Sequence, residues 1–482
     1  MIREAAGLVA VNLLLAGLGA GALLVIGTWR AAGTAGALVL SPFTGVALYL
    51  ALMPPLLYAG FAPTPQVLIV MTAVALALGV AVDRRRQSPR GGGLGRDGLL
   101  LAAAAAVPCA LLLLQASTKR AAEIDWQLDW AQKARLLTGH GGDFMGALDD
   151  RFFSAAYLNT HREYPLGLPA LTALDNHAMG RVDTTFVHVQ FVLVLIAFVA
   201  AMWVVLRPYA NPVVLAAGLT AVAASPGLQI RTLYGPWDMT VACTWVAGAV
   251  MVGIWLAGGA RRDLALGSVF LAGSLATKVE STANTGLLFV LVGLLLVSRR
   301  DWRSLRDAAV AAAAVVATAA PWQLYANAHD LHSRIVQPSL GRMVDQAGDL
   351  PTIVRSLTRS VVAWTWAGVV PLALACAVVM LLRGRNRELA VAYLVTFFGM
   401  IAALTFVYWN HTVALHPLLS ESASRTITTV QVLTLVVLPL LAERALGDIA
   451  LPWPARAAAG EMSGDGPPAP VAPAWSPAGD GP

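Results

Sequence analysis

The chain has 482 residues, of which 57% are hydrophobic and only 12% are charged, whereas an average soluble domain carries about 25% charged residues. Its 33 basic and 27 acidic side chains gather in short clusters between long apolar runs. A run of about 18 apolar residues can cross a hydrocarbon core about 30 Å thick. This composition excludes a secreted disulfide scaffold, a nucleic-acid binder and a disordered protein, and it predicts an all-α polytopic membrane protein in a lipid bilayer.

The apolar runs predict about 13 transmembrane helices. The first run, from about Gly7 to Gly27, lacks the charged n-region and the clear A-x-A cleavage site of a signal peptide, so we expect a retained helix. The expected spans are 6–28, 36–59, 66–83, 98–116, 184–206, 211–225, 239–257, 264–277, 284–298, 308–325, 359–382, 389–408 and 426–442.

Arginine clusters set the expected orientation. They follow the spans that end near residues 83, 257, 298 and 382, and basic residues collect on the cytoplasmic side of membrane proteins. Alternation places on the opposite, outer face the region of Lys278 and the segments 117–183, 226–238, 326–358 and 409–425.

The outer segment 117–183 is the longest stretch between spans and is rich in aromatic residues. Within it, Trp126 and Trp130 recur on one helical face, and Asp125 and Asp129 share the neighbouring face. This pattern is typical of an amphipathic helix at the membrane surface. A carboxylate at that level could act as a general base toward a hydroxyl group, or both could be solvated surface charges.

Two later outer positions combine charged and aromatic side chains. Trp237 lies beside Asp238. The pair could stack on a sugar and bind its hydroxyl groups. Equally, Trp237 could be a residue of the aromatic belt and Asp238 a helix N-cap. Lys278 and Glu280 interrupt a pair of apolar helices. Lys278 could bind a phosphate with Glu280 as its partner. Alternatively, it could be a lysine at a helix end whose side chain extends to the membrane–water interface.

His416, Ser424 and Arg425 lie at the entrance of the last expected span. Because Arg425 is expected on the outer face, the preference of basic residues for the cytoplasmic side does not explain its position. A guanidinium there can bind a phosphate through two hydrogen bonds, and the helix N-terminus adds partial positive charge. An interfacial anchor is the alternative.

Other sequence signals bear on cofactors and on the end of the chain. Cys109, Cys243 and Cys376 lie in apolar runs without CxxC spacing and are expected to be small hydrophobic core residues. No glycine-rich nucleotide-binding motif occurs in a strand–helix context, so an ATP-driven function has no support. We expect no cofactor and no metal ligands, with a divalent metal between Asp125 and Asp238 as the alternative.

Residues 443–482, rich in proline, glycine and alanine, are expected to form a disordered cytoplasmic tail.

Taken together, these positions resemble the GT-C superfamily of polytopic glycosyltransferases, in particular the bacterial protein O-mannosyltransferases and lipid A aminoarabinose transferases. The first outer loop of those proteins starts with an acidic residue followed by a Trp and a Lys-Ala pair, and later carries a Tyr-Pro step. The corresponding residues here are Asp125, Trp130, Lys133-Ala134 and Tyr164-Pro165.

Three later motifs extend the resemblance. A Gly-x-x-Asp turn, a Lys-x-Glu step and a late His followed by a Ser-Arg pair have their counterparts in Gly235–Asp238, in Lys278–Glu280 and in His416 with Ser424-Arg425. The similarity covers residues 97–442, the GT-C-like catalytic domain, with 117–183 as its outer catalytic loop. Residues 1–96 are therefore expected to be an N-terminal extension of three helices.

The resemblance implies an inverting transfer of a sugar from a polyprenyl-phosphate donor, on the periplasmic or extracellular side of the cell membrane. The acceptor would be a hydroxyl group of a cell-envelope glycan, lipid or protein. Asp125 would be the catalytic base, and Lys278 and Arg425 would bind the donor phosphate. The residues expected to bind substrate are Asp129, Tyr164, Trp237, Asp238, Glu280, His416 and Ser424.

Two other classes stay open, a transporter or flippase of a lipid-linked or polar substrate and a non-catalytic membrane scaffold. A transporter needs ionisable or helix-breaking positions near the middle of the bilayer, where this sequence is almost free of charge. The aromatic segment 117–183 also favours the transferase. That interpretation predicts that Asp125, Lys278 and Arg425 line one cavity.

Overall fold

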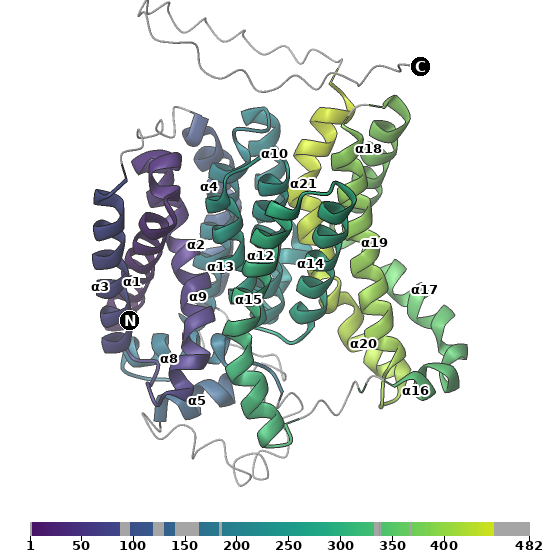
Figure 1. Ribbon diagram of the computed structural model, residues 1–482. Coiled ribbons are helices and arrows are strands. Elements are labelled where there is room, and N and C mark those ends of the chain that lie inside the picture. Colours follow the sequence, from purple (N-terminus) through teal and green to yellow (C-terminus); the bar gives the residue numbers. More distant parts are fainter. Residues whose placement is uncertain are drawn as a thin grey trace, which may run out of the picture. The chain divides into compact units, whose positions relative to one another are not determined.

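In the computed structural model, every element among the described residues is a helix (Figure 1), which confirms the all-α class. The described residues are 2–86, 97–118, 130–139, 163–182, 186–331, 337, 339–366, 368–384 and 386–447. The chain divides into two units, Met1–Ala445 and Leu446–Pro482. All the helices belong to the first unit, and nearly all of the expected tail 443–482 lies outside the described residues.

The helices of the first unit alternate with short turns. The N-terminal half contains α1 (Ile2–Ile26), α2 (Thr28–Tyr58), α3 (Pro65–Arg84), α4 (Asp97–Thr118), α5 (Ala131–Gly139), α8 (Gly167–Met179), α9 (Phe186–Leu206), α10 (Pro212–Ala224) and α11 (Pro226–Tyr234). The C-terminal half contains α12 (Pro236–Leu256), α13 (Arg261–Leu275), α14 (Glu280–Ser298), α15 (Trp302–Ala328), α16 (Leu340–Asp345), η2 (Ala347–Asp349), α17 (Leu350–Val361), η3 (Trp364–Trp366), α18 (Val369–Arg383), α19 (Arg387–Trp409), α20 (Leu415–Thr426) and α21 (Thr428–Ala445).

Ten helices among the described residues are long and apolar enough to span a membrane, or eleven if the bent pair α10–α11 counts as one span. The chain is therefore a multi-pass membrane protein. These lengths do not confirm the expected count of about 13. The expected spans at 264–277 and 359–382 fall on α13 and α18, which have 15 residues each. At a rise of about 1.5 Å per residue such a helix is only about 22 Å long.

Glycines bring α1 and α2 into close backbone contact, as is usual for helices packed inside a membrane. A Cβ atom on Gly19 would lie 1.9 Å from the carbonyl oxygen of Ser41, and one on Gly45 would lie 1.7 Å from that of Leu15. In turn, α2 packs against α9 and α13. The first three helices therefore belong to the same compact unit as the rest, and their assignment as a separate extension stays a prediction.

Ion pairs join segments that the sequence places on the cytoplasmic side. Arg261 Nε lies 2.6 Å from Asp307 Oδ2, and Arg299 binds Glu388 at 3.2 Å. These contacts hold the starts of α13, α15 and α19 at one end of the bundle. Near the other end of α15, Trp322 Nε1 donates to the carbonyl oxygen of Glu163 at 2.8 Å. The contacts of α15 thus lie near its two opposite ends, and the expected orientation stays a prediction.

Candidate functional site

Two helix breaks and one long helix converge on one small cavity. The first lies between α11 and α12 at Gly235, where the missing N–H of Pro236 prevents the helix from continuing. The second lies between α13 and α14, where the hydroxyl of Ser281 donates to the carbonyl oxygens of Ser274 and Lys278. The third element is the pair α20 and α21, which continues past the turn residue Ile427 as one apolar helix, Leu415–Ala445. Each break ends a helix beside the start of the next.

The charged residues at these breaks follow the direction of the helix dipoles. Asp238 and Glu280 lie in the first turns of α12 and α14, while Arg231 and Arg425 lie in the last turns of α11 and α20. Carboxylates are stabilised at helix N-termini and cations at C-termini. The ends of α11, α12 and α14 therefore bring both signs of charge to one place, with Lys278 in the break that follows α13 and Arg425 on the long helix of α20 and α21.

The cavity lies near one end of the spanning helices. Its residue Asp238 is in the first turn of α12, a helix of 21 residues that rises about 32 Å from end to end. That length is close to the thickness of a hydrocarbon core. The charged cluster is therefore at the level of a membrane boundary and not at the middle of the bundle.

Lys278 is the centre of the cluster. Its Nζ lies 2.9 Å from Asp238 Oδ1 and 3.1 Å from Glu280 Oε1. The side chains of Lys278 and Asp238 are only 8% and 2% exposed, against 24% for Glu280. Burial lowers the pKa of Lys278, but the carboxylates of Asp238 and Glu280 outweigh this effect and raise the pKa to about 12. Lys278 is therefore a charged, buried cation at neutral pH.

Tyr164 connects the outer segment to this ion pair. Its hydroxyl donates to Glu280 Oε1 at 2.6 Å, and Lys278 Nζ lies 5.6 Å from the centre of its ring. Burial, and then the nearby Glu280 carboxylate, raises the pKa of Tyr164 well above its usual value. The phenol is therefore neutral and fixes the Glu280 carboxylate by a charge-assisted hydrogen bond.

Aromatic side chains join α5 to the start of α12. The rings of Trp130 and Trp237 are stacked with a centroid distance of 5.6 Å and an interplanar angle of 9°, and Trp130 also contacts Tyr164. Lys133 is almost fully buried and donates from Nζ to the carbonyl oxygen of Tyr164 at 3.4 Å. These contacts attach the described part of the outer segment to Asp238 through its neighbour Trp237.

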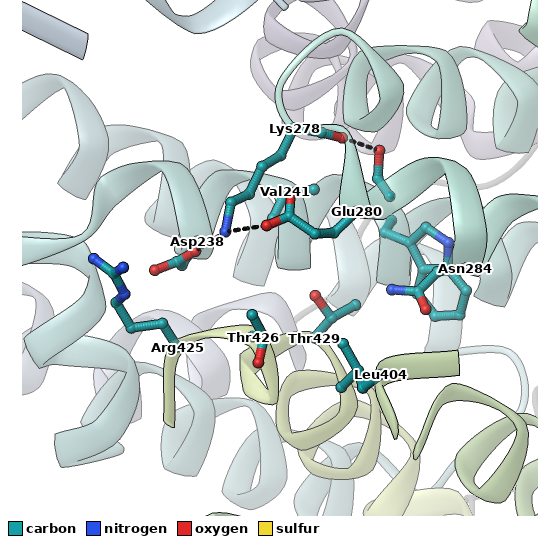
Figure 2. Close-up of a pocket in the computed structure, with 11 residues that line it drawn as sticks. Asp238, Val241, Lys278, Glu280, Asn284, Leu404, Arg425, Thr426 and Thr429 are labelled. Carbon is teal, nitrogen blue, oxygen red and sulfur yellow. Dashed lines mark hydrogen bonds and ion pairs between the residues drawn. The ribbon is translucent and has the colours of Figure 1, made fainter. Parts of the chain in front are cut away.

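Arg425 and Arg231 complete the positive side of the cluster. Both are close enough to act electrostatically on the Asp238 carboxylate, and Figure 2 shows Asp238 between Arg425 and Lys278. Arg231 donates to the hydroxyl of Ser424 at 3.0 Å. The sequence analysis did not select Arg231. Its position in an outer turn four residues before Gly235, where cytoplasmic charge offers no explanation, was the signal that could have found it.

The cavity itself is small. Its volume is about 20 Å³, which is room for about one water molecule. Charged and polar side chains from α12, the α13–α14 break, α14 and the long helix of α20 and α21 line it, together with the apolar side chains of Val241, Trp245 and Leu404 (Figure 2). Asp238 Oδ2 and Glu280 Oε2 are buried and have no hydrogen-bond partner. The cavity therefore offers both anionic and cationic groups to a polar ligand.

The structure brings together some of the expected site residues and separates others. Lys278 and Arg425, two of the three residues expected in one cavity, both line it. Asp125 and Asp129 lie outside the described residues, so their positions stay predictions. His416 is exposed on α20 and does not line the cavity, because it precedes Arg425 by nine residues, about 14 Å along the helix.

The described part of the chain contains no group of three His, Cys, Asp or Glu side chains that could bind a metal ion. The alternative of a metal between Asp125 and Asp238 stays a prediction, since Asp125 is not among the described residues. No family model, curated protein or solved structure matches this chain in comparisons of its sequence and fold.

Proposed function

We propose that the chain is a GT-C-type membrane glycosyltransferase, which moves a sugar from a polyprenyl-phosphate donor to a hydroxyl group of a cell-envelope acceptor. The reaction would occur on the periplasmic or extracellular face of the cell membrane. The observation that carries the proposal is the meeting of Lys278, Arg425 and Arg231 beside two helix breaks near one end of the spans. A phosphate gains negative charge when the sugar leaves it, and preorganised cations stabilise that charge.

In the proposed reaction the anomeric carbon exchanges one oxygen for another. The acceptor oxygen attacks from the face opposite the phosphate, the bond to the phosphate oxygen breaks, and the phosphate leaves with the electron pair, so the configuration inverts. The acceptor proton passes to Asp125 as general base. In the sequence Asp125 precedes Trp130 by five residues, and its place in the site is part of the proposal.

Donor binding would require the cluster to open. A cavity of about 20 Å³ cannot hold a phosphate ester with its sugar. In the proposal, the donor phosphate takes the place of the two carboxylates as partner of Lys278. Asp238 and Glu280 are then available to accept hydrogen bonds from sugar hydroxyl groups. Tyr164, which donates to Glu280, would fix that carboxylate during the exchange.

The test is sugar transfer by the full chain in lipid nanodiscs. A panel of radiolabelled polyprenyl-phosphate sugars is offered with envelope glycans, lipids or peptides as acceptors. Asp125→Asn should lower transfer by at least 100-fold while donor binding persists. Glu123→Gln, a neighbouring change outside the proposed site, should keep wild-type activity. Transfer at the wild-type rate by Asp125→Asn would remove Asp125 from the mechanism, and no transfer from any donor would contradict the proposed function.

A transporter is the second candidate, and the broken helices favour it. Discontinuous helices whose ends meet around charged groups are a recurrent feature of transporter binding sites, and here the breaks α11–α12 and α13–α14 meet in that way. Proteoliposomes distinguish the two. A transporter moves a labelled lipid-linked substrate across the membrane unchanged, whereas the transferase releases polyprenyl phosphate and labels the acceptor.

A further inference from the structure

A segment away from the cavity, α16 to α17, is attached to the end of α19 and lies beside α19 and α20 at the edge of the first unit (Figure 1). Trp409, the last residue of α19, donates from Nε1 to the carbonyl oxygen of Gln346 at 3.2 Å. Gln346 donates in turn to the carbonyl oxygen of His411 at 3.0 Å, and Asn410 Oδ1 accepts from the backbone N–H of Ser339 at 2.9 Å. The segment is therefore held at the level where α19 ends.

That level corresponds to a membrane surface. With 23 residues, α19 is about 34 Å long, slightly more than a hydrocarbon core. Large apolar side chains are exposed along it up to Phe406, and they include Phe398 at 57%. A tryptophan at the end of such a helix is typical of the aromatic belt at the headgroups. The segment is thus continuous with a surface that faces lipid.

Two apolar side chains of α16 point away from the protein. Leu340 is 83% exposed and Val344 is 75% exposed. They are four residues apart and so share one helical face. Water solvates such a face poorly, whereas the acyl region directly beneath the headgroups would cover it. Their exposure therefore indicates an apolar environment outside the protein.

The following helix adds positive charge. Ile353, Leu357 and Val361 form the buried stripe of α17, which packs against α19 and α20. Arg355 and Arg359 are exposed on the remaining surface of the helix.

The two acidic residues of the segment offset its charge only in part, because Arg342 on α16 is a third arginine. Asp349 lies 3.2 Å from His411 Nε2, and Asp345 is exposed on α16. An exposed apolar face beside exposed arginines is the composition of a helix that lies in the interface of an anionic membrane.

We propose that α16 and α17 form a membrane-surface anchor. Leu340 and Val344 insert between the acyl chains of the adjacent leaflet, and Arg355 and Arg359 bind the phosphates of anionic phospholipid headgroups. The arginine side chains are long enough to reach the headgroups from a helix that lies partly within the interface. The proposal depends on the level of the segment and on its exposed residues, and it holds whether the protein is a transferase or a transporter.

Spin labels on the full chain in nanodiscs test the insertion. In a Cys109→Ala background, a nitroxide is attached at Leu340→Cys or Val344→Cys, with Phe398→Cys as the lipid reference and the exposed Arg303→Cys as the water reference. Both test labels should resemble the lipid reference in accessibility to oxygen. Their accessibility to the neutral, water-soluble nickel complex NiEDDA should be several-fold below that of the water reference.

Two other results would overturn the proposal. High accessibility to NiEDDA at both positions would place α16 in water. Low accessibility to both reagents would show that protein covers this face, either another polypeptide or a second copy of the chain. Either result leaves the proposed function of the cavity untouched, because that function is measured by sugar transfer.

Lipid composition tests the arginines. For the Val344→Cys label, accessibility to NiEDDA should be lower in phosphatidylglycerol nanodiscs than in phosphatidylcholine nanodiscs. Arg355→Gln with Arg359→Gln should abolish this difference, while Arg303→Gln, a change of the same charge elsewhere, should keep it. Equal accessibility in the two lipids for the unchanged arginines would overturn the proposed headgroup contacts.

Discussion

Replacing Lys278 by methionine should destabilise the protein by about 3 kcal/mol. The change keeps most of the side-chain volume but leaves Asp238 and Glu280 without their shared cation. Removing one partner of a buried ion pair costs about 3–5 kcal/mol, because the other charge stays buried. Lys278 and Asp238 are 8% and 2% exposed, so that range applies. The lower end is expected because Arg425 also acts on Asp238.

The free energy of unfolding can be measured in mixed detergent micelles by titration with a denaturing detergent. Asp238→Asn should also destabilise the protein. Lys278→Met with Asp238→Asn should lose at least 1 kcal/mol less than the sum of the single changes, since residues in contact couple by about 0.5–3 kcal/mol. Arg303→Met, an exposed control, should stay within about 0.5 kcal/mol of wild type. Additive single effects, or a loss under 1 kcal/mol for Lys278→Met, would refute the buried pair as a stabilising contact.

The remaining predictions concern donor affinity, a hydrogen bond, pH and helix packing. Arg425→Gln should raise the Kd for a labelled polyprenyl-phosphate sugar about 10- to 150-fold, because the donor phosphate loses a charged hydrogen bond. Arg425→Lys should restore only part of the affinity. Tyr164→Phe should lower the free energy of unfolding by about 1.5–3 kcal/mol, because Glu280 loses its donor. Folding raises the pKa of Lys278 from 10.5 to about 12, so its stabilising contribution is complete below about pH 10 and disappears as pH rises through 12. The stability difference between wild type and Lys278→Met should therefore be constant from pH 7 to about 10 and then shrink. Gly45→Ala should destabilise the protein by about 1–3 kcal/mol in the same detergent titration, because its Cβ would overlap the backbone of α1.

Hydropathy was sufficient to predict the class of the fold and most of its spans. Long apolar runs become helices because a membrane requires every backbone polar group to be satisfied within the segment. The count of spans was harder to predict, because hydropathy does not measure where an apolar helix stops. Thus Pro226 divides one apolar region into α10 and α11, which are bent by 46°. Similarly, α13 ends after 15 residues, before Lys278.

The members of the site were only partly predictable from the sequence. Asp238 was selected as a carboxylate beside Trp237, and Lys278 as a cation between two apolar helices, but which partner each would find depends on how α12 and α13 pack. Arg231 was missed because it belongs to a helix of nine residues, too short to produce a hydropathy signal. His416 was selected for its chemistry, and the rotation of α20 places it away from the cavity.

The pattern of charges at the breaks explains why one small cavity can hold so many ionisable groups. Asp238 and Glu280 are at the N-termini of helices, and Arg231 is at the C-terminus of another. The helix dipoles therefore stabilise these three charges before any ion pair forms. Lys278, which has no helix terminus of its own, is the group that depends most on direct contact with Asp238 and Glu280. An anionic ligand that took the place of Asp238 and Glu280 would restore the direct contact on which Lys278 depends.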